Sequence, residues 1–76
     1  MKNIEIYQEP IALYQLLKLE ALVSSGGEAK AAIDAGKVLV NNAVETRRRK
    51  KIVSGDIIEF EKQQFEIVLK PKGQDN

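Results

Sequence analysis

The stretch that decides the fold runs from residue 24 to residue 42 and reads SSGGEAKAAIDAGKVLVNN. It opens with a capping box, because Ser25 and Glu28 lie three residues apart and can each accept a hydrogen bond from a free N–H at a helix start. Small and apolar residues then recur at helical spacing as far as Gly36, a residue type that often ends a helix in the left-handed conformation. The valines and the Asn pair that follow predict a strand and a tight turn. A helix leading directly into a β-hairpin is therefore the centre of the predicted fold.

Two more elements are predicted on the N-terminal side of this stretch. Ile4 and Ile6 alternate with polar residues, which predicts a strand over residues 2–7. Pro10 suits the first turn of a helix, because its missing N–H would have no intrahelical partner there, and leucines recur at helical spacing after it. We therefore expect a first helix over residues 10–21, joined to the second helix in an αα-hairpin.

The pairing at the Asn turn can be drawn in two ways. A two-residue loop would pair Val40 with Ala43, and a three-residue loop would pair Val40 with Val44. The three-residue loop places Val38, Val40 and Val44 on one face of the hairpin, and we expect this register.

The last third of the chain predicts two further strands. One passes through residues 58–60, after a turn at a Ser-Gly-Asp triplet, and the last turn falls at residues 62–64. Phe65, Ile67 and Leu69 are expected to alternate inward on the final strand. Residues 71–76 contain no apolar side chain and are expected to form a disordered tail, which leaves residues 1–70 as a single domain.

Composition limits the function. The 76 residues leave room for one domain and include neither Cys nor His, which excludes disulfides, thiolate metal sites and imidazole acid–base chemistry. We therefore expect no enzyme activity, no metal site and no cofactor. The sequence also lacks an apolar run long enough to span a bilayer and lacks the apolar core of a signal peptide, so we expect a cytoplasmic protein with no membrane partner and no small-molecule substrate.

The formal net charge of +1 conceals an uneven distribution. Residues 28–51 carry seven basic and three acidic side chains, a local charge of +4, and the remaining residues carry five basic and eight acidic ones, a charge of −3. Residues 47–51 form an unbroken basic run, whose mutual repulsion a polyanion would relieve. Arginine favours phosphate because its planar fork binds two acceptors at once. A solvated surface loop is the alternative interpretation of this run.

The start of the second helix is another candidate for anion binding. Helix N-termini present free N–H groups and the positive end of the helix dipole, and residues 24–27 lie at such a position. The alternative is structural, because Gly26 and Gly27 permit a tight turn and Glu28 already supplies a negative charge there. Lys30, one turn into the helix, can either extend the basic surface or pair with Asp34.

Together, residues 24–30, Ile33, Gly36, Val38, Val40, Asn41 and residues 54–58 resemble the S4-like RNA-binding domain. The segments at residues 16–20 and 43–47 are similar to its small free-standing bacterial members of the YbcJ type, and the resemblance extends from Ile4 to Leu69. Family members usually carry Gly at the hairpin tip where this chain has Asn42.

The resemblance implies an α+β fold, with a two-helix unit packed on a small, mostly antiparallel sheet (the S4-like, or alpha-L, RNA-binding fold). It also implies RNA lying across the second helix and the adjoining loops. The residues expected to bind RNA are Ser25, Gly26, Gly27, Lys30, Lys37, Arg47, Arg48, Arg49, Lys50 and Lys51.

The function expected on these grounds is non-enzymatic binding of structured RNA, either ribosomal or transfer RNA, with the ribosome as a candidate partner. Two other classes remain as alternatives. A protein-interaction module without nucleic-acid binding is one, because ubiquitin-like proteins share the hairpin and Gly-Asp features. A DNA-binding helix-turn-helix is the other, and it is disfavoured by the acidic residues and alanines of the second helix.

Overall fold

Residues 1–71 of the chain are described in this computed structural model, which contains nine short elements within that range. In chain order they are β1 (Lys2–Ile6), β2 (Ile11–Ala12), α1 (Leu13–Leu19), α2 (Gly26–Asp34), β3 (Val38–Val40), β4 (Ala43–Val44), β5 (Lys51–Ile52), β6 (Ile57–Phe60) and β7 (Gln63–Leu69).

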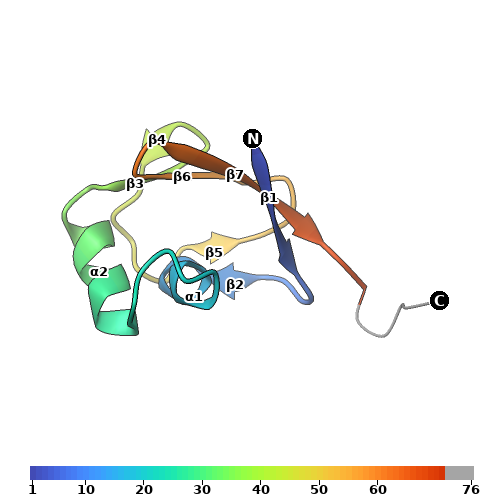
Figure 1. Cartoon of the computed structure of the whole chain (residues 1–76), viewed down its shortest axis with the longest axis horizontal. Coiled ribbons are helices and arrows are strands. Elements are labelled where there is room, and N and C mark those ends of the chain that lie inside the picture. The colour runs from blue at the N-terminus through green and yellow to red at the C-terminus, as the bar shows by residue number, and fades with distance from the viewer. Residues whose placement is uncertain (72–76) are drawn as a thin grey trace.

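Two sheets organise these elements. The larger has five strands in the order β1-β7-β6-β3-β4, with β1 parallel to β7 and the other neighbours antiparallel, and the smaller pairs β2 with β5. Both helices and the small sheet lie on the same side of the large sheet (Figure 1). The predicted class, a two-helix unit on a mostly antiparallel sheet, is therefore confirmed.

The core fills the space between the large sheet and the helices. Alternate residues of β1, β3, β6 and β7 face inward, as the period of two along a strand requires. Ala29 and Ile33 of α2 are fully buried in this core. The core side chains with at most 2% exposure are Ile4, Leu13, Leu16, Leu17, Ala29, Ile33, Val38, Ile52, Ile58 and Ile67.

Helix α2 begins and ends as predicted. The Ser25 hydroxyl accepts a hydrogen bond from the Glu28 N–H at 3.1 Å. The Glu28 carboxylate accepts from the N–H and the hydroxyl of Ser24, one residue earlier than the usual capping box would have it. Gly36 follows the helix with φ of 76°, in the left-handed conformation. The capping residues therefore define both ends of this helix.

Helix α1 is shorter than predicted. It runs over Leu13–Leu19, and Pro10 lies outside it. Residues 11 and 12 instead form β2, in which Ile11 is in register with Ile52 and Ala12 with Lys51. The prediction was wrong at this end because pairing with a strand some 40 residues away competes with the local helical preference that Pro10 indicates.

The β3–β4 hairpin has the shorter of the two loops. Val40 is in register with Ala43, and Leu39 with Val44, so the expected three-residue loop is wrong. Asn41 and Asn42 have φ of 52° and 70°, the positive values of a two-residue turn whose twist matches that of the flanking strands. Val44 consequently lies on the opposite face from Val40 and is 58% exposed.

The β6–β7 hairpin uses the same kind of turn. Phe60 is in register with Gln63, and the two residues between them, Glu61 and Lys62, have φ of 52° and 66°. The turn therefore precedes the predicted position at residues 62–64. Leu69 also differs from expectation, because it ends β7 at the margin of the sheet and is 37% exposed. The predicted tail, residues 71–76, lies outside the described residues except for Pro71.

The end of α1 generates a stability prediction. Ala21 has φ of 57° and its N–H donates to the Lys18 carbonyl, while the Leu22 N–H donates to Leu17, the bond pattern that usually carries Gly at this position. Ala21→Gly should therefore raise the free energy of unfolding by about 0.5–1 kcal/mol, because it removes the steric cost of a left-handed Cβ. Thermal unfolding should show a midpoint higher by roughly 2–8 °C.

The matched control is Ala31→Gly, at an exposed position inside α2. That change should lower the free energy of unfolding by about 0.8–1 kcal/mol, because glycine is unfavourable in a helix interior. Equal destabilisation by both substitutions would contradict the assignment of strain to Ala21.

Candidate nucleic-acid interface

The basic loop, defined here as residues 47–51, is fastened to the start of α1 by its backbone. The Leu13 N–H donates to the Lys50 carbonyl at 2.9 Å, and the Tyr14 N–H donates to the Arg48 carbonyl at 3.0 Å. Among the residues that the structure describes, no side chain caps this end of α1. Because the first N–H groups of a helix lack intrahelical partners, the carbonyls of the basic loop serve as the cap of α1.

This attachment determines which way the loop presents its charges. The Lys50 N–H closes a turn onto the Arg47 carbonyl at 3.2 Å, and Lys51 continues into β5, where it pairs with Ala12. The backbone of the loop is thus held against α1 and β2. The cationic side chains extend from a fixed backbone.

Arg47 is held by the residue two positions before it. The Glu45 carboxylate accepts hydrogen bonds from the Arg47 backbone N–H at 3.0 Å, from Nε at 2.9 Å and from Nη2 at 3.1 Å. These bonds, led by those from the guanidinium, lower the pKa of Glu45 to about 2 and raise the pKa of Arg47. The Arg47 side chain is still 69% exposed, so a ligand can reach it.

Arg48 joins the loop to the end of α2. Its Nε donates to Asp34 Oδ1 at 3.0 Å, and its Nη2 donates to Asp34 Oδ2. The guanidinium lowers the pKa of Asp34 through these bonds, and the carboxylate raises the pKa of Arg48. Asp34 is the last residue of α2, where a negative charge opposes the helix dipole, so Arg48 also offsets an unfavourable interaction.

Lys30 is positioned by an aromatic ring. Its Nζ lies 4.9 Å from the centre of the Tyr14 ring, a cation–π distance, while Asp34 is engaged by Arg48. Lys30 therefore does not form the predicted pair with Asp34, and its extension of the basic surface stays a prediction. Tyr14 links both sides, because its backbone binds the loop and its ring faces Lys30.

Three cations of the loop have no carboxylate partner. Within residues 1–71, Arg49, Lys50 and Lys51 form no ion pair. Together with Arg47 they line a hollow of about 380 Å³. Because all the lining residues are basic, the hollow concentrates positive potential in a space that suits an anionic group such as phosphate.

The start of α2 is a weaker candidate for anion binding than the basic loop. Gly26 and Gly27 face open space, since a Cβ at Gly26 would meet nothing within 4 Å and one at Gly27 only Ser25 Oγ at 3.9 Å. The Ser25 hydroxyl is used by the helix cap, and hydrogen bonds from Ser24 lower the pKa of Glu28, so that a negative charge stands at this helix end. Phosphate contact at Ser25, Gly26 and Gly27 stays a prediction. A phosphate there would compete with the Glu28 carboxylate for the positive end of the helix.

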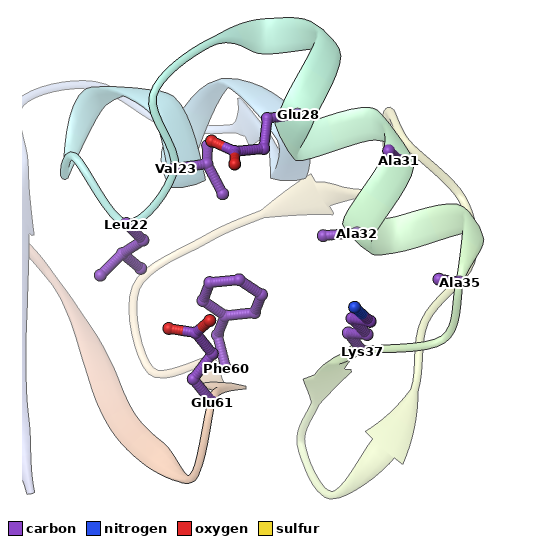
Figure 2. A pocket seen from close by; sticks show the side chains of 9 residues that line it. All are labelled: Leu22, Val23, Glu28, Ala31, Ala32, Ala35, Lys37, Phe60 and Glu61. Carbon is purple, nitrogen blue, oxygen red and sulfur yellow. The ribbon is translucent and has the colours of Figure 1, made fainter.

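Lys37 lies beside a different hollow, between α2 and the β6–β7 hairpin (Figure 2). Its companions there include two carboxylates, Glu28 and Glu61, the ring of Phe60 and several alanines of α2. The basic loop lines none of this hollow. The structure therefore does not bring Lys37 together with the other predicted RNA-binding cations, and its role in RNA binding stays a prediction.

Sequence reasoning missed the residues that organise the loop. Glu45 lies two positions before Arg47, a spacing that could have indicated the pair, because such side chains share a face of an extended chain. No local signal points to Tyr14 or to the Arg48–Asp34 pair, since both depend on tertiary contacts. Among residues 1–71, no cluster of acidic side chains could hold a metal ion, and neither helix is long and apolar enough to cross a membrane.

Comparison with known protein families identifies the family of this chain. Residues 4–68 match the family model of the S4 domain. The chain belongs to the S4 domain family. The predicted resemblance is thus confirmed over nearly all of the chain.

The chain is also similar to two curated proteins, and each match spans most of that protein's length. YbcJ of Escherichia coli (strain K12), whose name carries RNA binding as a suggested activity, is 47% identical over 58 residues, which span 76% of this chain and 83% of YbcJ. RlbA of Bacillus subtilis (strain 168), whose name carries a suggested role in ribosome maturation, is 43% identical over 58 residues, 76% of this chain and 82% of RlbA.

A solved structure shares the fold. The solution structure of E. coli YbcJ, described as revealing an αL motif involved in RNA binding, matches with a TM-score of 0.67 and 42% sequence identity. The match covers 90% of this chain and 87% of YbcJ. Sequence and structure thus agree on an S4-domain, RNA-binding fold.

The Arg47–Glu45 pair generates a pH prediction. A carboxyl whose pKa is lowered on folding adds stability above its unfolded pKa of about 4.3. That contribution is lost as the pH falls toward the folded value of about 2. Glu45→Gln should therefore lower the free energy of unfolding by about 0.2–1 kcal/mol at neutral pH, and the difference from the parent chain should shrink between about pH 4.3 and pH 2.

Denaturant unfolding measured at several pH values checks this expectation. The control is Glu61→Gln, because the Glu61 carboxylate makes no ion pair within residues 1–71. A difference for Glu45→Gln that stays constant down to pH 2 would show that the ion pair adds nothing to stability.

Proposed function

We propose that this S4-domain chain is a non-enzymatic, cytoplasmic protein that binds structured RNA, with ribosomal RNA favoured over transfer RNA. The observation that carries the proposal is the basic loop, whose backbone caps α1 while Arg49, Lys50 and Lys51 form no ion pair among residues 1–71. Such an arrangement presents positive charge at a fixed position.

The fixed backbone favours binding. A flexible basic tail would lose conformational entropy on binding, whereas a loop held by hydrogen bonds at Leu13 and Tyr14 has lost much of it on folding. Repulsion among neighbouring cations is relieved when phosphates approach. The loop is therefore pre-organised for a polyanion.

The kind of RNA is inferred from the side chains near the loop. Aromatic residues make up 5% of the sequence, so the chain lacks the stacking platforms that hold unpaired bases. Contacts to phosphates and to the shape of a helix or a folded junction fit an arginine- and lysine-rich surface better. The suggested role of RlbA in ribosome maturation supports ribosomal RNA as the ligand and the ribosome as the partner.

The salt dependence of RNA affinity should report how many phosphates the basic loop contacts. If only the three unpaired cations of the loop neutralise phosphates, log affinity should fall with log salt at a slope of about −2 to −3. If Arg47 and Arg48 also bind phosphate, the slope should steepen to about −3.5 to −4.5. Fluorescence titrations of labelled ribosomal RNA helices between 50 and 300 mM KCl (about twofold steps) would measure it, and an affinity independent of salt would contradict the electrostatic mechanism.

Removing the three unpaired charges should weaken RNA binding and spare the fold. The variant Arg49→Gln, Lys50→Gln, Lys51→Gln should lose about 10- to 100-fold in affinity, at roughly 0.5–1 kcal/mol for each contact. The matched control Lys2→Gln, Lys18→Gln, Lys62→Gln removes the same charge at positions outside the loop and should lose much less. Both variants should keep the thermal midpoint within a few degrees, because all the altered side chains except Lys50 are exposed and none forms an ion pair within residues 1–71.

Equal weakening by the two variants would indicate that only net charge matters and would overturn the assignment to the basic loop. Crosslinking in cells followed by sequencing of the bound RNA would identify the ligand. Recovery of transfer RNA in place of ribosomal RNA would correct the choice of ligand and leave the loop as the binding element.

A further inference from the structure

The large sheet has one face that no helix covers. Both helices and the small sheet lie on the inner side, and the opposite, outer face is open among residues 1–71 (Figure 1). Residues that alternate with the core along β1, β3, β6 and β7 point to this outer face. Their chemistry differs sharply from that of the basic loop.

The outer face carries two rows of side chains. In three places the strand register sets an apolar residue directly opposite a glutamate on the neighbouring strand. The pairs are Leu39 with Glu59 between β3 and β6, Ile57 with Glu66 between β6 and β7, and Val68 with Glu5 between β7 and β1. Successive pairs step across the sheet one strand at a time. The result is an apolar row and a parallel acidic row, both crossing the sheet diagonally, with neighbours in a row about 7–8 Å apart. Val44, aligned with Leu39, extends the apolar row onto β4.

The acidic row is largely uncompensated. Glu5 has Lys70 at 3.6 Å, but Glu59 and Glu66 have no cationic partner within residues 1–71. Gln64 donates one hydrogen bond to Glu59 at 3.2 Å. Glu59 and Glu66 are diagonal neighbours on adjacent strands, so their charges repel each other across the sheet. Leu39, Ile57 and Val68 are each half-buried. Two uncompensated carboxylates beside this partly exposed apolar row suit a ligand that is both cationic and apolar.

We propose that this outer face docks a basic segment of a partner protein, one in which Arg or Lys side chains alternate with Leu or Val. The apolar side chains of the segment would cover Leu39, Ile57 and Val68, and its cations would meet Glu59 and Glu66. RNA is repelled from this face by the same carboxylates. The inference goes beyond RNA binding and does not depend on it, because the basic loop takes no part in this surface.

The size of the surface sets the expected strength. Three strands and a few apolar side chains make an interface at the small end of the range for protein complexes, so binding should be transient and in the micromolar range. Rim charges of this kind contribute mainly to orientation and to the rate of association. Salt should therefore weaken the complex without abolishing it.

The test uses the full chain labelled with ¹⁵N and a synthetic peptide of alternating Arg and Leu. The expected result is saturable binding, with amide shifts concentrated at Leu39, Ile57, Glu59, Glu66 and Val68. Two control peptides, one alternating Arg with Ser and one alternating Glu with Leu, should bind at least tenfold more weakly. Equal binding by the Arg–Ser peptide, or shifts located elsewhere, would overturn the proposal.

Substitutions can distinguish an effect of this surface from a general effect of the protein's acidic side chains. Glu59→Gln with Glu66→Gln should weaken peptide binding by about 3- to 10-fold. The control Glu20→Gln with Glu61→Gln makes the same change of charge at exposed positions off this face and should leave binding unchanged. RNA affinity should not fall in either variant, and the thermal midpoint of Glu59→Gln with Glu66→Gln should stay level or rise.

A drop in that midpoint would assign the two carboxylates a structural role and overturn the docking proposal. Self-association of the unliganded chain in sedimentation, abolished by the same two substitutions, would show that the face joins copies of this chain and would also overturn it. Loss of RNA binding by the basic-loop variant leaves this test intact, so failure of one proposal is distinguishable from failure of the other.

Discussion

Two backbone hydrogen bonds, from the N–H groups of Leu13 and Tyr14 to the carbonyls of Lys50 and Arg48, join the basic loop to the start of α1. A helix start without a side-chain cap needs acceptors from elsewhere, and the basic loop provides them. The same contact brings residues 11–12 beside β5, which explains why they are a strand and why α1 begins at Leu13. The start of the first helix and the placement of the five basic residues therefore depend on the same contact.

Local signals in the sequence were sufficient for the second helix and for the alternation of the large sheet. Ser25, Glu28 and Gly36 act through neighbours in the chain, so their roles can be predicted without a structure. The hairpin register was predicted wrongly although a local signal existed, because Asn41 and Asn42 both tolerate the positive φ that a two-residue turn requires. The strand at residues 11–12 also escaped prediction, since its partner lies far along the chain and Pro10 suits a helix start as well.

The candidate site likewise has a part that the sequence predicts and a part that depends on the fold. Counting charges located the basic loop, and residues 28–51 carry the expected excess of +4. Counting could not show that Arg47 and Arg48 are held by Glu45 and Asp34, because an ion pair depends on the fold. The structure therefore divides the five basic residues into three that form no ion pair within residues 1–71 and two that already have a carboxylate partner. It also separates Lys37 from the loop by placing it beside Glu28 and Glu61.

The near-neutral total charge is best understood through this separation. The basic loop lies with α1 on the helical side of the large sheet (Figure 1). The alternation of buried and exposed residues along β6 and β7 places Glu59 and Glu66 on the opposite side. A chain with a net charge of +1 is only weakly attracted to nucleic acid from a distance, which limits non-specific binding. At close range the opposed charges act as a dipole, which would turn the loop toward a phosphate backbone and the acidic face away from it. For the proposed RNA binding, this arrangement of charge would therefore contribute orientation more than overall attraction.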